Sequence, residues 1–333
     1  MRHAPLAVAA LLCVAGPLAA HHSFAPHFDI NKPVDIAGVV TQFEQRNPHA
    51  YLHVTVQDVD GRSNEWRCES HGVTQLTRNG ITPSMLKPGT VVRITGSQHR
   101  RDPHECFFNT VQTEDGMVYD VNGGGQRGTV PTATVAQRDS IYGIWLLQPA
   151  GRPTSGPQFM MDYTTDAAKA AIAQYNPFTD DPTYRCEPMA IRRGWFAPGT
   201  PMAIRQDGDD IIIQHEWMDI ERRVHMNQDA VPEGTPAAQL GYSRGHWEGD
   251  TLVVETDHFT PGVLNQFVEV AGEPMRGLLH SDALRTVERI RFEPQRNTIQ
   301  LAMEHYDPVF FTQDFPVVEG EFAASDLDIK PFG

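Results

Sequence analysis

The sequence YLHVTVQD at residues 51–58 decides the fold of the N-terminal half. Leu52, Val54 and Val56 fall on one face of an extended chain, whereas Tyr51 and polar residues fall on the other. The pair Asp60-Gly61 follows and is typical of a tight hairpin turn. The pattern therefore predicts a half-buried β-strand that returns through this turn into a second strand.

The sequence on both sides of this hairpin predicts a small barrel. Further strands are expected at residues 34–45, 64–70, 91–96, 106–113 and 117–121. A short helix is expected at residues 73–78, with Asn79-Gly80 to end it. Three strands, a helix and then two strands, here followed by the short strand at residues 117–121, is the order of an OB-like barrel, which we assign to residues 21–121.

The C-terminal half, residues 140–333, follows a Gly- and Thr-rich linker at residues 122–139. Residues 166–175 have the best helical pattern, with Asp166 as the expected N-cap. Strand-like segments follow at residues 202–206, 211–217, 221–226, 242–248, 251–256, 283–292, 298–306 and 309–316. Sequential strands with short returns predict a larger antiparallel, lipocalin-like β-barrel or a β-sandwich, and a barrel of this size can hold one small ligand. The Pro-rich residues 176–201 could cover either end of the barrel, and the sequence leaves open which.

Composition excludes several classes of protein. Lys and Arg number 27 against 42 Asp and Glu, which gives a formal net charge of -15. Such a chain lacks the basic surface that nucleic acids and anionic lipids require. Hydrophobic residues make up 40 %, enough to build folded cores. The sequence contains neither a phosphate-binding loop nor a dinucleotide fingerprint, so we expect no organic cofactor. We expect a small-molecule ligand and, because of the acidic charge, no nucleic-acid partner.

Residues 1–20 have the pattern of a secretory signal peptide. Arg2 precedes an apolar run from Leu6 to Val14, and small residues lead to Ala20. The run is too short to span a bilayer. We therefore expect a periplasmic or secreted protein without membrane insertion, whose mature chain begins at His21.

Cleavage at this point would leave three cysteines, Cys68, Cys106 and Cys186. An odd number allows at most one disulfide within the chain, and an oxidising compartment would permit it. We favour the pair Cys68 and Cys106, because both fall in strands of the first domain.

Histidines gather near the expected mature N-terminus. Cleavage would expose an α-amine on His21, beside the imidazoles of His21 and His22, and His49 follows the turn Asn47-Pro48. An amine combined with imidazole nitrogens is a strong donor set for Cu(II). The sequence thus indicates a metal site, with copper as the cofactor, at His21, His22 and His49. The alternative is that these histidines are exposed polar residues on a loose terminus.

Polar residues on the expected barrel strands are candidates for chemistry. The candidate catalytic residues are His246, Glu248, His280 and Arg289. The candidate ligand-binding residues are Arg222, Tyr242, Trp247 and Glu288. An inward Arg or His is able to orient a carboxylate or to act as a general base. The alternative is that these residues are outer-face charges or a buried ion pair that joins strands. Adjacent residues such as Glu288 and Arg289 must face opposite sides of their strand.

Several short motifs occur in order along the N-terminal half. They are His21-His22-Ser23-Phe24-Ala25, Asn47-Pro48-His49 and Leu86-Lys87-Pro88-Gly89. With these motifs, residues 21–120 resemble a bacterial secreted family of unknown function. The C-terminal half, with GHWEGDTLVV at residues 245–254, is similar to other uncharacterised bacterial exported proteins. The resemblance implies export from a bacterial cytoplasm and supplies neither an activity nor a catalytic residue.

Three functions are compatible with the sequence. The leading hypothesis is a periplasmic or secreted protein that binds a small ligand in its second barrel and copper at its N-terminus. The alternative is a cofactor-independent lyase, isomerase or hydrolase with its active site in the same barrel. The third is a structural envelope module whose OB-like domain contacts a protein partner. Convergence of His246, Glu248, His280 and Arg289 in one pocket would favour the enzyme.

Overall fold

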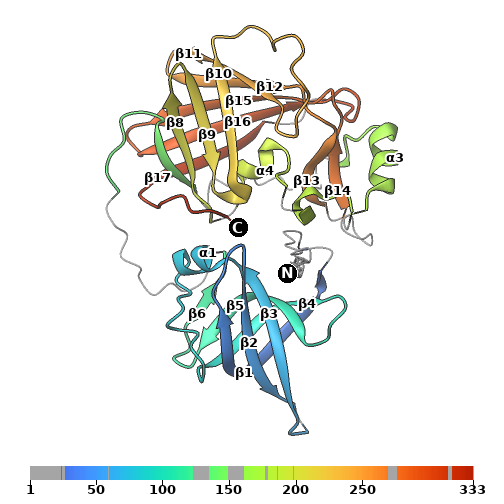
Figure 1. Cartoon of the computed structure of the whole chain (residues 1–333), viewed down its shortest axis with the longest axis vertical. Helices are drawn as coiled ribbons and strands as arrows, with labels where there is room; N and C mark the ends of the chain where they lie inside the picture. Colours follow the sequence, from blue (N-terminus) through green and yellow to red (C-terminus); the bar gives the residue numbers. More distant parts are fainter. Residues whose placement is uncertain are drawn as a thin grey trace, which may run out of the picture.

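The computed structural model describes residues 24, 27–58, 60–122, 135–148, 161–176, 179–185, 187–197, 199–268, 276–313 and 317–332. They form two closed barrels of β-strands (Figure 1). The predicted fold class, mainly β with a small barrel followed by a larger one, is therefore confirmed, and the larger body is a barrel rather than a sandwich. The predicted signal peptide and most of the predicted linker lie outside the described residues.

The N-terminal barrel contains β1 (Phe28–Glu44), β2 (His49–Gln57), β3 (Ser63–His71), α1 (Val73–Arg78), β4 (Val91–His99), β5 (Glu105–Thr113) and β6 (Val118–Asp120). Its sheet runs β3-β2-β1-β4-β5-β6, and an additional parallel pairing of β3 with β5 closes it. Strands β1 to β5 form the closed ring, and β6 pairs with β5 outside it. A five-stranded Greek-key barrel with a helix between its third and fourth strands has the OB arrangement, as expected. Helix α1 occupies the predicted residues and ends at Asn79.

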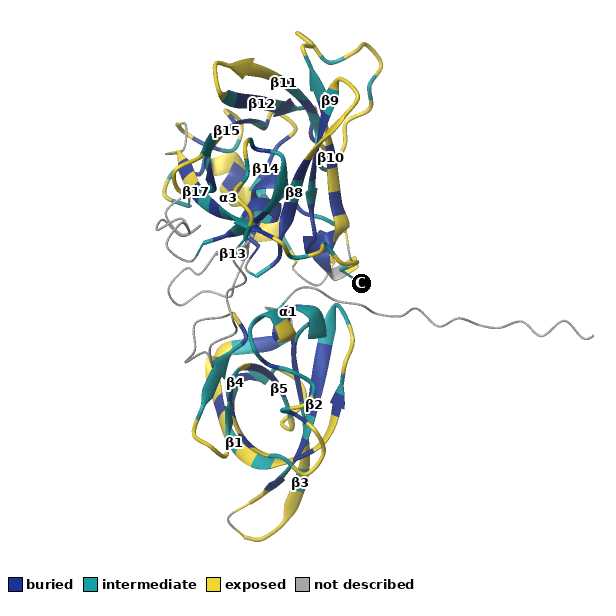
Figure 2. Cartoon of the chain, turned by 90° about the vertical axis from the view of Figure 1, so that its left-hand side faces the viewer, coloured by how far each residue is buried: buried dark blue, intermediate teal, exposed yellow. Residues whose placement is uncertain are grey.

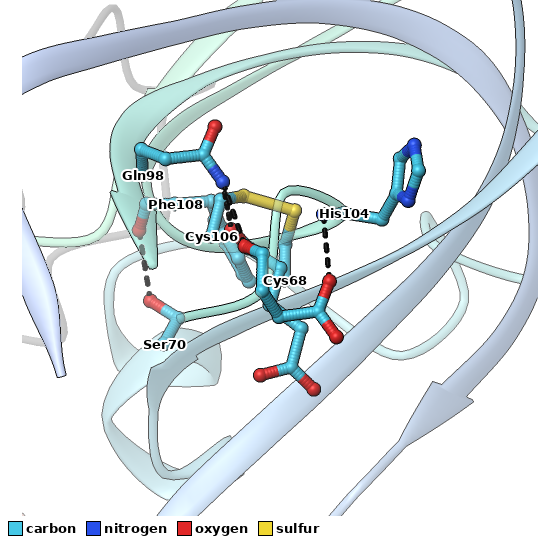
Figure 3. Close-up of a disulfide and its surroundings, with 8 residues drawn as sticks. Cys68, Ser70, Gln98, His104, Cys106 and Phe108 are labelled. Carbon is cyan, nitrogen blue, oxygen red and sulfur yellow. Dashed lines mark hydrogen bonds between the residues drawn. A yellow bond between two sulfur atoms is a disulfide. The ribbon is translucent and has the colours of Figure 1, made fainter. Parts of the chain in front are cut away.

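A disulfide between Cys68 and Cys106 joins the two strands that close this barrel (Figure 3). The two cysteines are register partners in the parallel β3–β5 pairing, their Cα atoms lie 4.5 Å apart, and both are fully buried. Next to the disulfide, Ser70 Oγ donates a hydrogen bond of 3.1 Å to the Phe108 carbonyl oxygen. The predicted pairing of Cys68 with Cys106 is confirmed, whereas Cys186 lies outside the described residues.

The C-terminal barrel has nine strands: β7 (Gly143–Leu147), β8 (Met202–Asp207), β9 (Asp210–His215), β10 (Ile220–Met226), β11 (Tyr242–Glu248), β12 (Thr251–Asp257), β15 (Arg285–Glu293), β16 (Thr298–Tyr306) and β17 (Val318–Ser325). Neighbours in the barrel are neighbours in sequence, and β17 pairs with β7. The larger barrel is antiparallel, as predicted, except for one pairing, because β10 and β11 are parallel. A closed barrel can alternate strand direction throughout only if its number of strands is even, so nine strands require at least one parallel pair.

Several elements lie outside the barrel wall: α3 (Asp166–Gln174), the turn η2 (Pro182–Arg185), α4 (Ile191–Trp195), the turn η3 (Trp217–Asp219) and the hairpin of β13 (Gly262–Val268) with β14 (Arg276–His280). The hairpin was not predicted. Helix α3 was predicted, but its N-cap is Thr165 and not Asp166. The hydroxyl oxygen of Thr165 accepts a hydrogen bond of 3.2 Å from the Ala168 backbone N–H, so Asp166 is already the first helical residue.

The strand expected at residues 309–316 is not formed in its described part, residues 309–313. Asp307 Oδ1 accepts hydrogen bonds from the backbone N–H groups of Val309 (3.2 Å) and Phe310 (3.1 Å). A side chain that captures nearby backbone donors turns the chain and competes with strand pairing. The last strand of the barrel, β17, therefore begins later, at Val318.

The two barrels touch through α1 and the C-terminal residues. Arg78 of α1 makes a two-pronged ion pair with Glu216, with Nη1–Oε1 and Nη2–Oε2 distances of 2.5 and 2.9 Å. Glu216 Oε2 also accepts a hydrogen bond of 2.8 Å from the Lys330 backbone N–H, and Arg78 Nη2 donates to the Asp328 carbonyl oxygen at 2.7 Å. The end of the chain accordingly lies between the barrels (Figure 1).

The interiors of the two barrels differ. Apolar side chains fill the N-terminal barrel, among them Val40, Leu52, Val54, Ile94, Phe108 and Val111. Buried and exposed positions follow one another along the strands of this barrel (Figure 2). The C-terminal barrel also has a large apolar cluster, but charged and polar side chains are buried with it: His215, Arg222, Ser243, Thr256, Thr286, Glu288 and His305. These polar residues define the candidate site.

Candidate functional site

A short helix, α4, closes one end of the C-terminal barrel, beside β13 and β14 (Figure 1). The Trp195 side chain is 1 % exposed, and its indole N–H donates a hydrogen bond to Glu288 of the barrel wall. Gly194 permits the close approach, because a Cβ there would lie 3.2 Å from His215 Cδ2. Helix α4, within the Pro-rich region, thus covers one end of the barrel, and we call this end the closed end.

A buried ion pair spans the barrel interior at the closed end. Arg222 Nη1 lies 2.5 Å from Glu288 Oε2, and Arg222 Nη2 lies 2.8 Å from Glu288 Oε1. The two side chains are 4 % and 0 % exposed. Arg222 Nη1 also lies 3.4 Å from the hydroxyl oxygens of Ser243 and Thr256. Bidentate pairing of a guanidinium with a carboxylate, plus the indole donor, compensates the buried charge of Glu288.

A row of inward polar side chains crosses four neighbouring strands at the same level. Register pairing places Ser243 beside Thr256, Thr256 beside Thr286, and Thr286 beside His305. We call these four residues the polar row, and all four are buried. Four residues along the strands from Thr256, Thr286 and His305, the inward positions are apolar: Leu252, Ile290 and Leu301. The barrel is therefore polar at its closed end and apolar further in.

Three histidines at the closed end are neutral at neutral pH. Burial lowers the pKa of His215 to about 3, and nearby Arg222 adds to the shift. Burial lowers the pKa of His305 to about 3, with contributions from Arg192 and His280. Burial also lowers the pKa of His280, although Asp307 opposes that shift. These rings therefore supply hydrogen-bonding nitrogens without positive charge.

Asp307 has a structural role beside this site. Its carboxylate accepts hydrogen bonds of 2.7 Å from both the backbone N–H and the hydroxyl of Ser281, in addition to the two N–H groups that follow it in sequence. His280, which directly precedes Ser281, donates a hydrogen bond of 3.0 Å from Nδ1 to the Ser281 carbonyl oxygen. Asp307 thus fixes the turn after β14 and is saturated with donors.

The four candidate catalytic residues do not converge in a pocket. His246 and Glu248 lie on the outer face of β11, 3.3 Å apart, with side chains 47 % and 57 % exposed. Arg289 also faces outward and pairs with Glu304 of β16. Register pairing places Val253 between His246 and Arg289. His280, in contrast, is buried on the separate β13–β14 hairpin. The geometry expected of an acid–base site is therefore not found at these residues.

The candidate ligand-binding residues divide between the two faces of the barrel. Arg222 and Glu288 lie inside, where they form the ion pair. Tyr242 lies outside, stacked on His225 at 4.5 Å, and its hydroxyl donates to Gln228 Oε1 at 2.8 Å. Trp247, near the end of β11, is 43 % exposed. Only the first two belong to the closed end.

The proposed metal ligands are not assembled in the described residues. His21 and His22 lie outside them. His49 Nδ1 lies 2.9 Å from Glu69 Oε1 and 3.1 Å from the Ser70 carbonyl oxygen. Among the residues that the structure describes, no three His, Cys, Asp or Glu side chains are placed to hold a metal ion. The copper site stays a prediction.

Comparison with known proteins bears on the N-terminal half alone. A model described as "Family of unknown function (DUF6152)" matches residues 9–107. This range extends from the predicted leader into β5, so the resemblance to an uncharacterised family holds for this part of the chain. No curated protein matches the chain. In the described ranges, no helix has the length and apolar character needed to cross a membrane.

The sequence did not single out α4, which supplies two side chains to the closed end. Trp195 contacts Glu288, and Arg192, one turn earlier, is 6 % exposed. The sequence around Arg192 carries no signal of burial, because Arg192 follows the apolar run Met189-Ala190-Ile191 but precedes Arg193, and arginines are seldom buried.

Proposed function

We propose that this chain is an exported protein that binds a small polar ligand at the closed end of its C-terminal barrel. The observation that carries the proposal is a group of buried polar atoms without a hydrogen-bond partner among the described residues: Arg192 Nε, His215 Nε2, Arg222 Nε and Thr286 Oγ1. All four belong to residues of the closed end. A buried donor or acceptor left unpaired costs about 1–3 kcal/mol.

Such a concentration of unpaired groups favours a ligand over a purely structural role. Native proteins pair the great majority of their buried polar groups, with water where protein atoms do not serve. Binding sites commonly combine apolar walls with a few convergent polar groups. The closed end has this composition, because the Trp195 ring and the apolar barrel interior adjoin the polar row.

Two observations support export. Residues 1–20 have the composition of a cleavable leader, and a disulfide joins Cys68 and Cys106. Disulfides persist in oxidising compartments and are rare in the cytosol.

The proposal is tested on the mature protein purified from its native host. We expect an N-terminus at His21, a small molecule that appears in the native mass and is lost on denaturation, and crystallographic density for it beside the polar row. A chain that retains residues 1–20 would overturn export. A closed end that holds only water would overturn ligand binding.

A pair of matched variants locates the ligand. Thr286→Val removes an inward hydroxyl of the polar row, whereas Thr251→Val removes a hydroxyl from the outer face of β12. We expect less ligand to be retained by the first variant and an unchanged amount by the second. Equal retention by both would contradict binding at the closed end.

A further inference from the structure

Arg192 is a buried cation without a carboxylate partner. Its side chain enters the closed end from α4 and is almost fully buried, at 6 % exposed. Its Nη1 donates a hydrogen bond of 3.3 Å to Asn265 Oδ1, and its guanidinium lies 5.7 Å from the centre of the Phe196 ring. Within the described ranges, Arg192 makes no ion pair with any carboxylate, and its Nε has no hydrogen-bond partner.

Arg222, in the same barrel, is a buried guanidinium that has a carboxylate partner, and it can be compared with Arg192. Both of its Nη atoms contact the two oxygens of Glu288 at 2.5 and 2.8 Å. Arg192 receives only a neutral amide oxygen. Moving a charge from water into a protein interior costs several kcal/mol unless an opposite charge and hydrogen bonds compensate it. The two arginines therefore differ by one missing negative charge.

The charges around Arg192 confirm that it is not compensated. Burial lowers the pKa of Arg192 to about 10, which leaves the guanidinium charged at neutral pH. The nearby rings of His280 and His305 are neutral, because burial lowers their pKa values. The Asp307 carboxylate is already occupied by four donors from Ser281 and the backbone. The excess at this site is thus a single positive charge.

We infer that the closed end binds a small organic acid through a single carboxylate held by Arg192, an inference that rests on the proposed function. A planar guanidinium matches a carboxylate with two parallel hydrogen bonds. The single negative charge of a carboxylate balances the single positive charge of Arg192, whereas a phosphate dianion would bring one negative charge too many. The Phe196 ring beside the guanidinium and Trp195, one turn along the same helix, supply an apolar surface for the body of the acid.

The geometry also places the ligand beneath α4. Arg192 and Trp195 lie three residues apart, on the same side of this five-residue helix. Both side chains are buried, so a ligand reaches Arg192 only when α4 first moves away from the barrel end. The helix then closes over the bound ligand. Binding is therefore expected to be slow compared with diffusion and to protect α4 from hydrogen exchange.

The inference is tested by titrating the full-length mature protein with sodium benzoate, sodium acetate, sodium phosphate and sodium chloride at constant ionic strength, and by following thermal unfolding. We expect a saturable stabilisation by the carboxylates, strongest with benzoate, and none by chloride. Phosphate acting better than either carboxylate would overturn the assignment to a monocarboxylate.

Two neighbouring arginines provide the variant and its control. Arg192→Gln keeps a polar side chain but removes the charge, whereas Arg193→Gln changes the neighbouring guanidinium of α4, which lies 5.3 Å from the centre of the Trp217 ring. We expect benzoate to bind Arg192→Gln at least about tenfold more weakly, the loss typical of a charged hydrogen bond, and to bind Arg193→Gln as it binds wild type. Equal weakening in both variants would contradict the inference.

The ligand-free state gives a second readout that a structural role would not produce. If the charge of Arg192 is compensated only by a bound anion, the substitution Arg192→Gln removes an uncompensated buried charge from the ligand-free protein. Ligand-free Arg192→Gln should therefore unfold at or above the wild-type temperature. A large drop would show that Arg192 supports the fold instead. A neutral molecule found in the native protein would overturn the anion inference alone, whereas a closed end that holds only water would overturn the proposed function as well.

Discussion

Each barrel contains one short parallel pairing of strands, but different chemistry secures this pairing in each barrel. In the N-terminal barrel β3 pairs with β5, and the Cys68–Cys106 disulfide joins the two strands. In the C-terminal barrel β10 pairs with β11, and Arg222 extends from β10 to hydroxyls on β11 and β12 and to Glu288 on β15. A covalent bond thus joins the parallel strands of the small barrel, whereas in the larger barrel an ion pair links β10 to β15 across the interior.

Barrel size explains the difference. Barrel diameter grows with strand number, and side chains from the wall fill a small barrel completely. The N-terminal barrel is of this kind, with an apolar interior. Nine strands enclose a wider space, and here Trp195 of α4 enters from outside the wall to fill part of it. The wider barrel thus holds buried charged and polar groups in its interior, whereas the narrow one has a packed apolar core.

The largest expected effect is a difference in acid stability. His215 and His305 have pKa values of about 3 in the C-terminal barrel, and His71 has one of about 4 in the N-terminal barrel, in each case mainly because of burial. An unfolded histidine takes up its proton near pH 6.5, so each of the three loses about 1.4 kcal/mol of stabilisation per pH unit below that point. Between pH 6.5 and 4.5 we expect a loss of about 4–5 kcal/mol in the C-terminal barrel and about 2 kcal/mol in the N-terminal one.

Hydrogen exchange of peptides from β2 and β16, corrected for intrinsic rates, measures the two barrels separately. His215→Gln removes one of the two titrating rings and should roughly halve the pH dependence of the C-terminal barrel. Equal pH dependence of the two barrels would show that the closed end opens to solvent more readily than its burial indicates.

The second effect concerns the ion pair. Glu288→Gln leaves Arg222 buried without its counter-charge, which should cost about 3–5 kcal/mol. The control is Glu304→Gln on the outer face of the adjacent strand, where the pair with Arg289 is partly exposed and its loss should cost less than about 1 kcal/mol. Urea unfolding at pH 7, followed by tryptophan fluorescence in a Trp66→Phe background, reports on the C-terminal barrel. Similar losses of stability in both variants would mean that the C-terminal barrel does not depend on the buried ion pair.

The third effect concerns the disulfide. Replacing both Cys68 and Cys106 with Ala removes a constraint across 38 residues, which should destabilise the N-terminal barrel by about 2–4 kcal/mol. Hydrogen exchange should increase in β2 and β3 and stay unchanged in β12 and β15. An equal increase in both barrels would show that they unfold as one unit.

The sequence was most informative where one physical rule dominates. Alternating polarity located β2, the Asn79-Gly80 pair ended α1, and adjacent residues such as Arg222 and Arg223 face opposite sides, with one buried and one half-exposed. Such signals are local. They hold whatever the rest of the chain does, which is why the fold class and the disulfide were predictable.

The closed end depends on long-range geometry, which local patterns do not contain. Nothing near Glu288 in the sequence indicates that Arg222, 66 residues earlier, is its partner. The inward and outward faces of β11 could not be distinguished, so the sequence proposed His246 and Glu248, which lie outside, and overlooked Ser243, which lies inside. The five-residue helix α4 is too short for a periodic pattern, so Arg192 was missed.

The smallest effect tests whether the two barrels depend on each other. Arg78 of the N-terminal barrel and Glu216 of the C-terminal barrel form a partly buried ion pair, at 13 % and 5 % side-chain exposure. A double-mutant cycle with Arg78→Met and Glu216→Gln should give a coupling energy of about 1–2 kcal/mol, because both oxygens of Glu216 contact the guanidinium. Thermal unfolding of the four proteins measures it. A coupling near zero would mean that the interface adds nothing to stability and that each barrel responds to pH, to reduction and to ligand independently of the other.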